Sequence, residues 1–162
     1  MTNQLRTIEI EHHEIHEGES FSAVYQATKD DAETLDLQIT TPATEYLHSV
    51  LEASSTLEAE VALYEAPTTS GGTAVTAYNR NRNSQNVAAA TVAHTPTVSA
   101  VGTLLAATTI GTGKSVGGNL RGISEWILKP STKYLLRITS GSNGNIITAT
   151  LDWYRVEKPD AS

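Results

Sequence analysis

The sequence predicts an all-β fold, an antiparallel sandwich of the jelly-roll type with about nine or ten strands and long loops. Apolar and polar residues alternate with a period of two along most of the chain, which places successive side chains on opposite faces of a strand. Turn-forming residues separate these segments, and no segment has the period of a helix of three turns. Long polar and glycine-rich connections in the middle of the chain favour a jelly roll over an immunoglobulin-like sandwich.

The N-terminal part begins with an expected strand over 5–16, where Ile8 and Ile10 share a side before Gly18 interrupts the pattern. A second strand is expected over 20–28 and a third over 34–41. Pro42 ends the third, because proline has no N–H for a ladder. The residues expected to share the inward faces of the second and third strands are Phe21, Ala23, Tyr25, Leu35, Leu37 and Ile39.

The next two segments, 46–54 and 57–65, are rich in alanine, leucine and glutamate, so a helix is an alternative interpretation. The alternation from Leu57 to Leu63 nevertheless favours a strand, and residues 54–56 have the composition of a turn. We therefore expect two strands with a turn between them. The inward residues would be Leu47, Leu51, Ala53, Leu57, Ala59, Val61 and Leu63.

The middle of the chain is expected to alternate short strands with loops. Strands are predicted over 73–78, 87–93 and 97–109. The very polar segment 79–86 is predicted to be a loop or an exposed edge, and the glycine-rich segment 111–122 a mobile loop.

The C-terminal part contains the clearest alternation, over 145–156. Strands are also predicted over 124–129 and 133–140. Residues 141–144 are expected to join the last two strands in a hairpin, with Asn143-Gly144 supplying positive φ angles. The last strand should have a dry face of Ile147, Ala149, Leu151 and Trp153 and a wet face of Thr148, Thr150, Asp152 and Tyr154.

The chain of 162 residues is long enough for one domain with a core. We expect an N-terminal arm over 1–7, a single β-sandwich domain over 8–156 and a C-terminal tail over 157–162. The N-terminal residues lack the apolar region of a signal peptide. No apolar run approaches the roughly 20 residues that span a bilayer, so no membrane partner is expected.

The charge and the lack of cysteine exclude several functional classes. With 18 acidic and 11 basic residues the net charge is −7, which disfavours a nucleic-acid partner because such binding needs a basic face. The absence of cysteine excludes disulfides, thiolate metal sites and a cysteine nucleophile. It also favours assembly in a reducing cytoplasm.

Two short motifs resemble catalytic or nucleotide-binding loops but lack necessary parts. Residues 111–115, Gly-Thr-Gly-Lys-Ser, resemble the end of a P-loop, but Thr108 stands where the first glycine belongs and no helix-forming segment follows. Residues 140–142, Ser-Gly-Ser, lack the strand-to-helix context of a nucleophile elbow. We therefore predict no catalytic residues and no enzyme activity.

The histidines His12, His13 and His16 lie close together with Glu14 near the N-terminus. On a strand, His12, Glu14 and His16 would share a face, and a further ligand would have to come from elsewhere. Solvated or interface histidines are the favoured interpretation. We predict no metal and no cofactor, and we keep a metal-dependent jelly-roll enzyme that uses these histidines as a minor hypothesis.

Arginine and asparagine are concentrated in the segment 79–86 of an otherwise acidic chain. Both residue types make directional contacts at protein interfaces, and arginine is enriched at hot spots. Trp126 and Trp153 are predicted to pack in the core rather than to form a sugar-stacking platform. The candidate protein-interface residues are Asn79, Arg80, Asn81, Arg82, Lys114 and Arg121.

Several segments, in order along nearly the whole chain, resemble a family of short phage virion proteins of the capsid decoration or cement type. The matching segments are Glu11-His12-His13-Glu14-Ile15-His16 with Gly18, Ile39-Thr40-Thr41-Pro42, Leu63-Tyr64-Glu65, Asn81-Arg82-Asn83-Ser84, Glu125-Trp126-Ile127-Leu128-Lys129, Tyr134-Leu135-Leu136-Arg137 and Leu151-Asp152-Trp153-Tyr154. The resemblance implies a β-rich protein on the outside of an icosahedral shell, commonly as a homotrimer. It supplies no active-site residues.

The leading hypothesis is therefore a non-enzymatic decoration protein, made in the host cytoplasm, that binds the major capsid protein on the exterior of the virion and stabilises the assembled head. An alternative is a glycan-binding module of a tail fibre or receptor-binding protein, which would use Tyr78, Trp126 or Tyr154.

Overall fold

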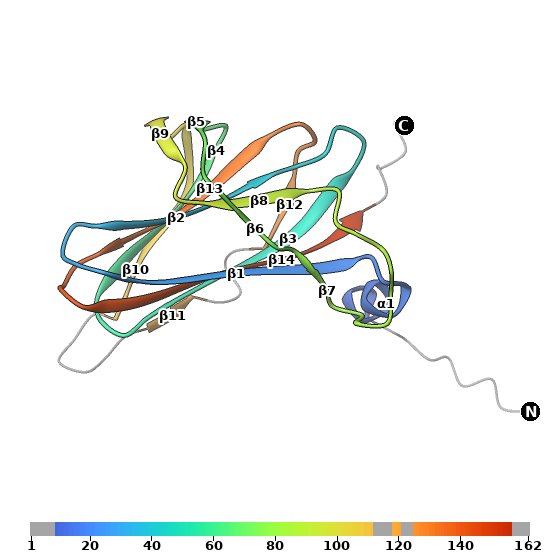
Figure 1. The fold of residues 1–162 in the computed structure, drawn as a ribbon, viewed down its shortest axis with the longest axis horizontal. Helices are drawn as coiled ribbons and strands as arrows, with labels where there is room; N and C mark the ends of the chain where they lie inside the picture. The colour runs from blue at the N-terminus through green and yellow to red at the C-terminus, as the bar shows by residue number, and fades with distance from the viewer. Residues whose placement is uncertain (1–8, 112–117, 121–124, 157–162) are drawn as a thin grey trace, which may run out of the picture.

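The computed structural model of the protein describes residues 9–111, 118–120 and 125–156. These residues form one short helix, α1 (Ile10–Glu17), and otherwise strands and loops (Figure 1). The strands are β1 (Ser20–Lys29), β2 (Thr34–Thr40), β3 (Tyr46–Ser55), β4 (Ala59–Glu65), β5 (Thr68–Ser70), β6 (Thr73–Val75), β7 (Tyr78–Asn79), β8 (Thr91–His94), β9 (Thr97–Ala100), β10 (Thr103–Ile110), β11 (Gly118–Leu120), β12 (Glu125–Leu128), β13 (Lys133–Ser140) and β14 (Asn145–Val156).

The strands form two six-stranded sheets and a small ribbon, all with antiparallel pairing. Sheet A has the order β11-β3-β14-β1-β7, and β12 also pairs with β3. Sheet B has the order β10-β4-β13-β2-β8-β6. The ribbon consists of β5 and β9, which project from one end of the molecule in Figure 1.

The winding of the central strands is that of a jelly roll. The order β1-β14-β3-β12 in sheet A faces β2-β13-β4-β10 in sheet B, and β1 and β2, β3 and β4, and β13 and β14 are consecutive strands in opposite sheets. Such a double sheet of interleaved antiparallel strands distinguishes a jelly roll from a meander. The expected all-β, jelly-roll-like sandwich is confirmed.

The core lies between the two sheets and follows the alternation of the sequence. On β14, the residues from Ile147 to Trp153 that face inward are no more than 2% exposed. On β2, β3 and β4 the apolar residues predicted to face inward are likewise buried, except Leu57, which lies before β4 and is partly exposed. The strand interpretation of 46–65 is therefore correct, and the helix alternative is excluded.

The predicted hairpin at residues 141–144 is wrong. β13 pairs with β2 and β4, whereas β14 pairs with β1 and β3, so this connection crosses from sheet B to sheet A. The dry faces of β13 and β14 face one another across the core, and alternation alone does not show whether two consecutive strands share a sheet. Gly144 supplies a positive φ of 69°. Its N–H donates to Asp30 Oδ1 at 3.0 Å, which ties this turn to the β1–β2 turn.

The predicted strand over 5–16 is also wrong in its described part, because Ile10–Glu17 is helical. Gly18 has a φ of 76° and donates its N–H to the Ile15 carbonyl, while Glu19 donates to the Glu14 carbonyl. These two bonds form a Schellman cap, which glycine favours because it lacks a Cβ. The alternation that suggested a strand rested on two isoleucines, one of which, Ile8, lies outside the described residues.

The middle segments form more and shorter strands than predicted. The segment 73–78 divides into β6 in sheet B and β7 in sheet A, and 97–109 divides into β9 and β10. Gly102 separates β9 from β10 with a φ of 83°, and a Cβ at this position would overlap the Glu65 carbonyl. Most of the predicted loop 111–122, the arm 1–7 and the tail 157–162 lie outside the described residues.

Candidate protein-interaction surfaces

The asparagines of the 79–86 loop hold the end of α1 instead of standing free. Asn79 is 7% exposed, and its Nδ2 donates to the carbonyls of Gly18 at 2.7 Å and Asn86 at 3.1 Å. Asn81 Nδ2 donates to the His16 carbonyl at 3.0 Å. Carbonyls at a helix C-terminus need hydrogen-bond donors, and these two predicted interface residues supply them from within the same chain.

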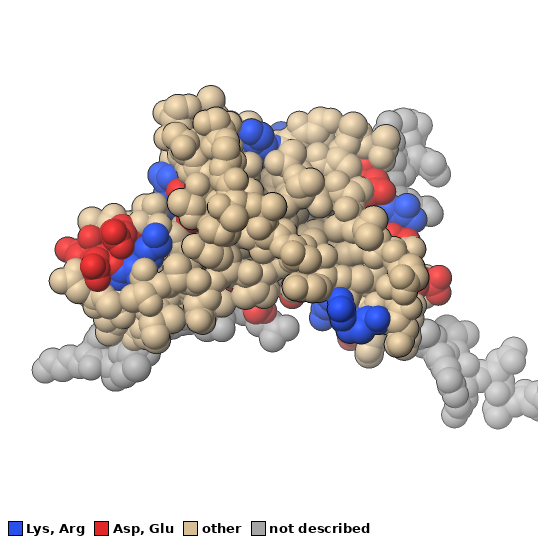
Figure 2. All heavy atoms as spheres, viewed as in Figure 1, with Lys and Arg blue, Asp and Glu red and all other residues tan. Residues whose placement is uncertain are grey.

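The arginines of the same loop lie closer to solvent. Arg80 Nη1 donates to Glu11 Oε1 at 2.7 Å, and the Arg82 guanidinium lies 5.2 Å from the centre of the Tyr78 ring. Figure 2 shows a group of Lys and Arg side chains at the end of the molecule that carries α1 and β7. The other two predicted interface residues, Lys114 and Arg121, lie outside the described residues.

The helical conformation changes the geometry of the histidines. His12 and His16 are one turn apart on α1 with ring centroids 5.7 Å from each other, while His13 Nδ1 lies 3.5 Å from Glu14. His12, Glu14 and His16 would share a common face only on a strand, and the segment is helical. In the described part of the chain, no group of three or more histidines and carboxylates is placed to hold a metal ion.

The outer face of sheet A carries a polar cluster that sequence reasoning missed. His48 Nε2 lies 2.5 Å from Glu125 Oε1, and the Tyr154 hydroxyl lies 2.5 Å from His48 Nδ1. Burial raises the pKa of Tyr154, and the negative charges of Glu125, Glu11 and Glu14 raise it further. The cluster joins β3, β12 and β14, so only the register of sheet A could have revealed it.

Exposed apolar side chains lie on the same outer face. Val24 on β1, Ile127 on β12 and Ile146 on β14 are 51%, 61% and 43% exposed. Thr148 and Thr150 of β14 lie on the same face, between β1 and β3. The pairing partners of the three apolar residues are Thr150, His48 and Thr28, which lie at different levels of the sheet, so the three apolar side chains are spread over this face and form no single patch.

The outer face of sheet B is instead largely covered. Leu135 is fully buried although it lies outside the central core cluster, and Gln38 beside it is 6% exposed. The ribbon accounts for this, because the Thr69 hydroxyl of β5 donates to Gln38 and Lys133 Nζ donates to the Thr69 carbonyl at 3.2 Å.

An ion pair lies on the same covered face. Arg137 Nε and Nη2 donate to the two carboxylate oxygens of Asp36, both at 2.8 Å. These hydrogen bonds raise the pKa of Arg137. The planar guanidinium binds both carboxylate oxygens and thereby fixes the register of β2 against β13. It also pairs the negative charge of Asp36 with a positive one.

A second polar cluster closes one end of the sandwich. The Tyr134 hydroxyl donates to Glu65 Oε2 at 2.9 Å and accepts the Lys129 N–H at 3.0 Å, while Lys129 Nζ donates to Glu65 Oε1 at 2.8 Å. Burial raises the pKa of Tyr134 to about 12. The Lys129 hydrogen bond, followed by the Tyr134 bond, lowers the pKa of Glu65.

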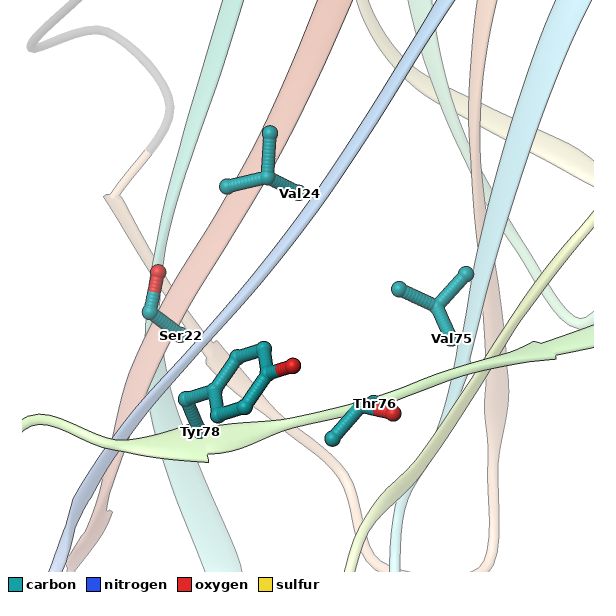
Figure 3. Close-up of a pocket in the computed structure, with 5 residues that line it drawn as sticks. All are labelled: Ser22, Val24, Val75, Thr76 and Tyr78. Carbon is teal, nitrogen blue, oxygen red and sulfur yellow. The ribbon is translucent and has the colours of Figure 1, made fainter.

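The two tryptophans pack as predicted. Trp153 is 2% exposed and lies against Phe21, with ring centroids 6.1 Å apart, and Trp126 packs partly buried against the core. Tyr78, in contrast, is 57% exposed. It lines a cleft of about 400 Å³ with Ser22, Val24, Val75 and Thr76, which Figure 3 shows between β1 and the β6–β7 segment.

Within the described residues, no helix is long and apolar enough to cross a membrane. The sequence matches no protein-family profile, and no curated protein is significantly similar to it.

Proposed function

We propose that the chain is a structural protein of a phage virion, of the capsid decoration type, that binds the outer surface of the assembled head. The observation that carries this proposal is the open outer face of sheet A, where Val24, Ile127 and Ile146 stand exposed on a rigid sheet. The ordered resemblance of segments along the chain to decoration proteins supports the same conclusion.

The outer face of sheet A is suited to contact with another protein surface. β14 pairs over ten residues with β1 on one side and with β3 on the other, so the backbone under this face is fixed. Threonine and valine side chains lose little rotamer freedom when a partner covers them. The proposed partner is the major capsid protein.

The proposed mechanism is bridging of adjacent shell subunits. A protein that binds the assembled lattice and not its separate parts stabilises the lattice by mass action. A homotrimer, as the resemblance implies, would bind through several equivalent faces and gain avidity without any stronger single contact. The protein would be made in the host cytoplasm and would end on the virion exterior.

The test is binding to undecorated capsids of the matching phage, followed by heating. Wild-type protein should co-sediment with the capsids and raise their disassembly temperature. Ile127→Asp should weaken binding about tenfold or more, because a charge would be buried at the contact. Leu104→Asp is the matched control, since Leu104 is an exposed residue of β10 in sheet B. Equal loss in both variants, or no capsid binding by wild-type protein, would contradict the proposal.

A glycan-binding module is the second candidate, and the exposed ring of Tyr78 beside the cleft favours it. Trp126 packs partly buried against the core, as predicted, so Tyr78 is the more accessible of the two rings. Glycan-array binding that Tyr78→Ala abolishes and Ile127→Asp leaves intact would establish this function in place of capsid decoration.

A further inference from the structure

We propose that the free edge of β1 accepts one extended strand from another polypeptide chain. This site adjoins the outer face of sheet A and shares the Val24 side chain with it, but it would use backbone groups of Val24, Gln26 and Thr28 in a notch at the side of the sandwich. The argument rests on the direction of these groups, on the unequal width of the two sheets and on the uncharged lining of the cleft.

The direction of the backbone groups follows from the pairing of β1 with β7. Arg80 donates its N–H to the Ser20 carbonyl at 2.8 Å, and the ladder continues to the pair Ser22 and Tyr78. Alternate residues of a strand direct their N–H and C=O to the same side, so Val24, Gln26 and Thr28 direct theirs to this edge. Among the described residues, β7 pairs with β1 no further than Ser22. The row beyond it is therefore open to an added strand.

The two sheets differ in width at this side of the molecule. Sheet B continues past β2 with β8 and β6, whereas in the described part of the chain sheet A has only the two-residue β7 beyond β1. The cleft of about 400 Å³ lies at this step, and Val75 and Thr76 face Val24 across it in Figure 3. Deeper in, Tyr25 of β1 stacks on His94 of β8 with ring centroids 3.8 Å apart, which closes the gap between the sheets.

This step selects one strand rather than the edge of a second copy. Antiparallel pairing of two β1 strands would bring both protruding sheets, each carrying β8 and β6, into the same layer, where they would collide. A single added strand meets no such obstacle. It would lie about 4.8 Å from β1, complete sheet A and cover the β6 side of the step.

The lining also defines the chemistry of the added strand. Ser22, Val24, Val75, Thr76 and Tyr78 are all uncharged, in a chain whose net charge is −7. None of these five side chains carries a charge that could replace the hydration of a lysine or glutamate directed into the cleft. The partner is therefore an extended segment with uncharged, β-branched or hydroxyl side chains at the positions that face the cleft.

The probe is the blocked peptide acetyl-Thr-Val-Thr-Val-Thr-amide, added at millimolar concentration to isotope-labelled protein. Nuclear magnetic resonance should show shifts at the amides of Val24, Gln26 and Thr28, and their hydrogen exchange should slow about tenfold or more. The amides of Tyr25 and Ala27 face β14 and should change little. A peptide that is N-methylated at alternate residues should not bind.

Two variants connect the response to the edge. Gln26→Pro removes one outward N–H at a position where an edge strand tolerates proline, and it should abolish peptide binding with the fold intact by circular dichroism. Thr150→Lys, on the neighbouring strand β14, is the control and should bind the peptide normally. Val24→Lys places a charge in the cleft and should weaken peptide binding. If Gln26→Pro is unstable, this variant tests whether the cleft contributes to peptide binding.

Three results would overturn the inference. These are absent shifts at the edge amides, equal binding by Gln26→Pro or by the N-methylated peptide, and slow exchange of the three amides in peptide-free protein, which would show an edge already paired. Capsid binding by Ile127→Asp is measured separately, so failure of strand addition and failure of the proposed function are distinguishable.

Discussion

The two outer faces of the sandwich differ although their strands show similar alternation. On sheet A the outward residues Val24 and Ile127 are more than half exposed, whereas on sheet B the outward residues Asp36 and Leu135 are buried. The β5–β9 ribbon lies over part of sheet B and bonds to it through Thr69, whereas among the described residues no such ribbon covers Val24 and Ile127 of sheet A. Whether an outward side chain of a strand is buried or exposed therefore depends on whether a segment distant in the sequence covers it.

The largest effect should come from the covered face. Leu135→Ala should lower the free energy of unfolding by about 3 kcal/mol, because it leaves a cavity under the ribbon. Ile127→Ala on sheet A should change it by less than about 0.5 kcal/mol. Urea denaturation of both variants measures the difference. Similar values would show that the two faces are equally covered.

A somewhat smaller effect is expected from two polar contacts, the Arg137–Asp36 ion pair on sheet B and the His48–Glu125 hydrogen bond on sheet A. Arg137→Ala should cost about 2 kcal/mol, because it leaves the Asp36 carboxylate buried without its partner; Arg137 keeps 23% exposure, which places the cost at the low end for such pairs. Glu125→Gln, which removes the charge beside His48 on sheet A, should cost about 0.5 kcal/mol or less. Thermal unfolding of the two variants measures the difference. A larger loss for Glu125→Gln would reverse the comparison.

The third comparison concerns pH. Tyr134 has a pKa of about 12 against an ordinary 10.0, so its contribution to stability is complete below pH 10 and is lost as the pH rises toward 12. The pKa of Glu65 lies below 4.5, so its contribution is present above that pH and is lost on acidification. Tyrosinate absorbance should show a component lost in Tyr134→Phe that titrates well above pH 10, and Tyr134→Phe should flatten the alkaline loss of stability. Titration of Tyr134 near pH 10 would contradict this.

The sequence predicted which face of each strand is buried better than it predicted which strands pair with each other. Ile147, Leu151 and Trp153 point inward as expected, because alternation depends only on the local geometry of a strand. The sheet to which β14 belongs depends on contacts with β1 and β3, far away in the sequence, and the 141–144 turn was therefore misjudged. The Tyr154–His48–Glu125 cluster was missed for the same reason. The one sequence feature that indicated the α1 helix is Gly18, which caps its C-terminus.

The interface residues show the same limit. Asn79 and Asn81 were predicted to lie at a protein interface, and in the structure their side-chain amides donate to the carbonyls of Gly18 and His16 in the same chain. A list of residues does not distinguish an external partner from an internal one. The exposed residues of sheet A were not singled out, because a single apolar residue at an outward position does not show whether another segment covers it.

The central position of β14 in sheet A has a consequence for biosynthesis. β14 is the final strand of the described chain, yet β1 and β3 both pair with it. On the ribosome, β1 must wait for the last strand to be translated before its main ladder can form. Non-local pairing of this kind folds slowly, over milliseconds to seconds, and leaves early strands exposed meanwhile. A nascent chain stalled before β14 should accordingly remain sensitive to protease and depend on chaperones, whereas release of the full chain should bring abrupt, whole-domain protection.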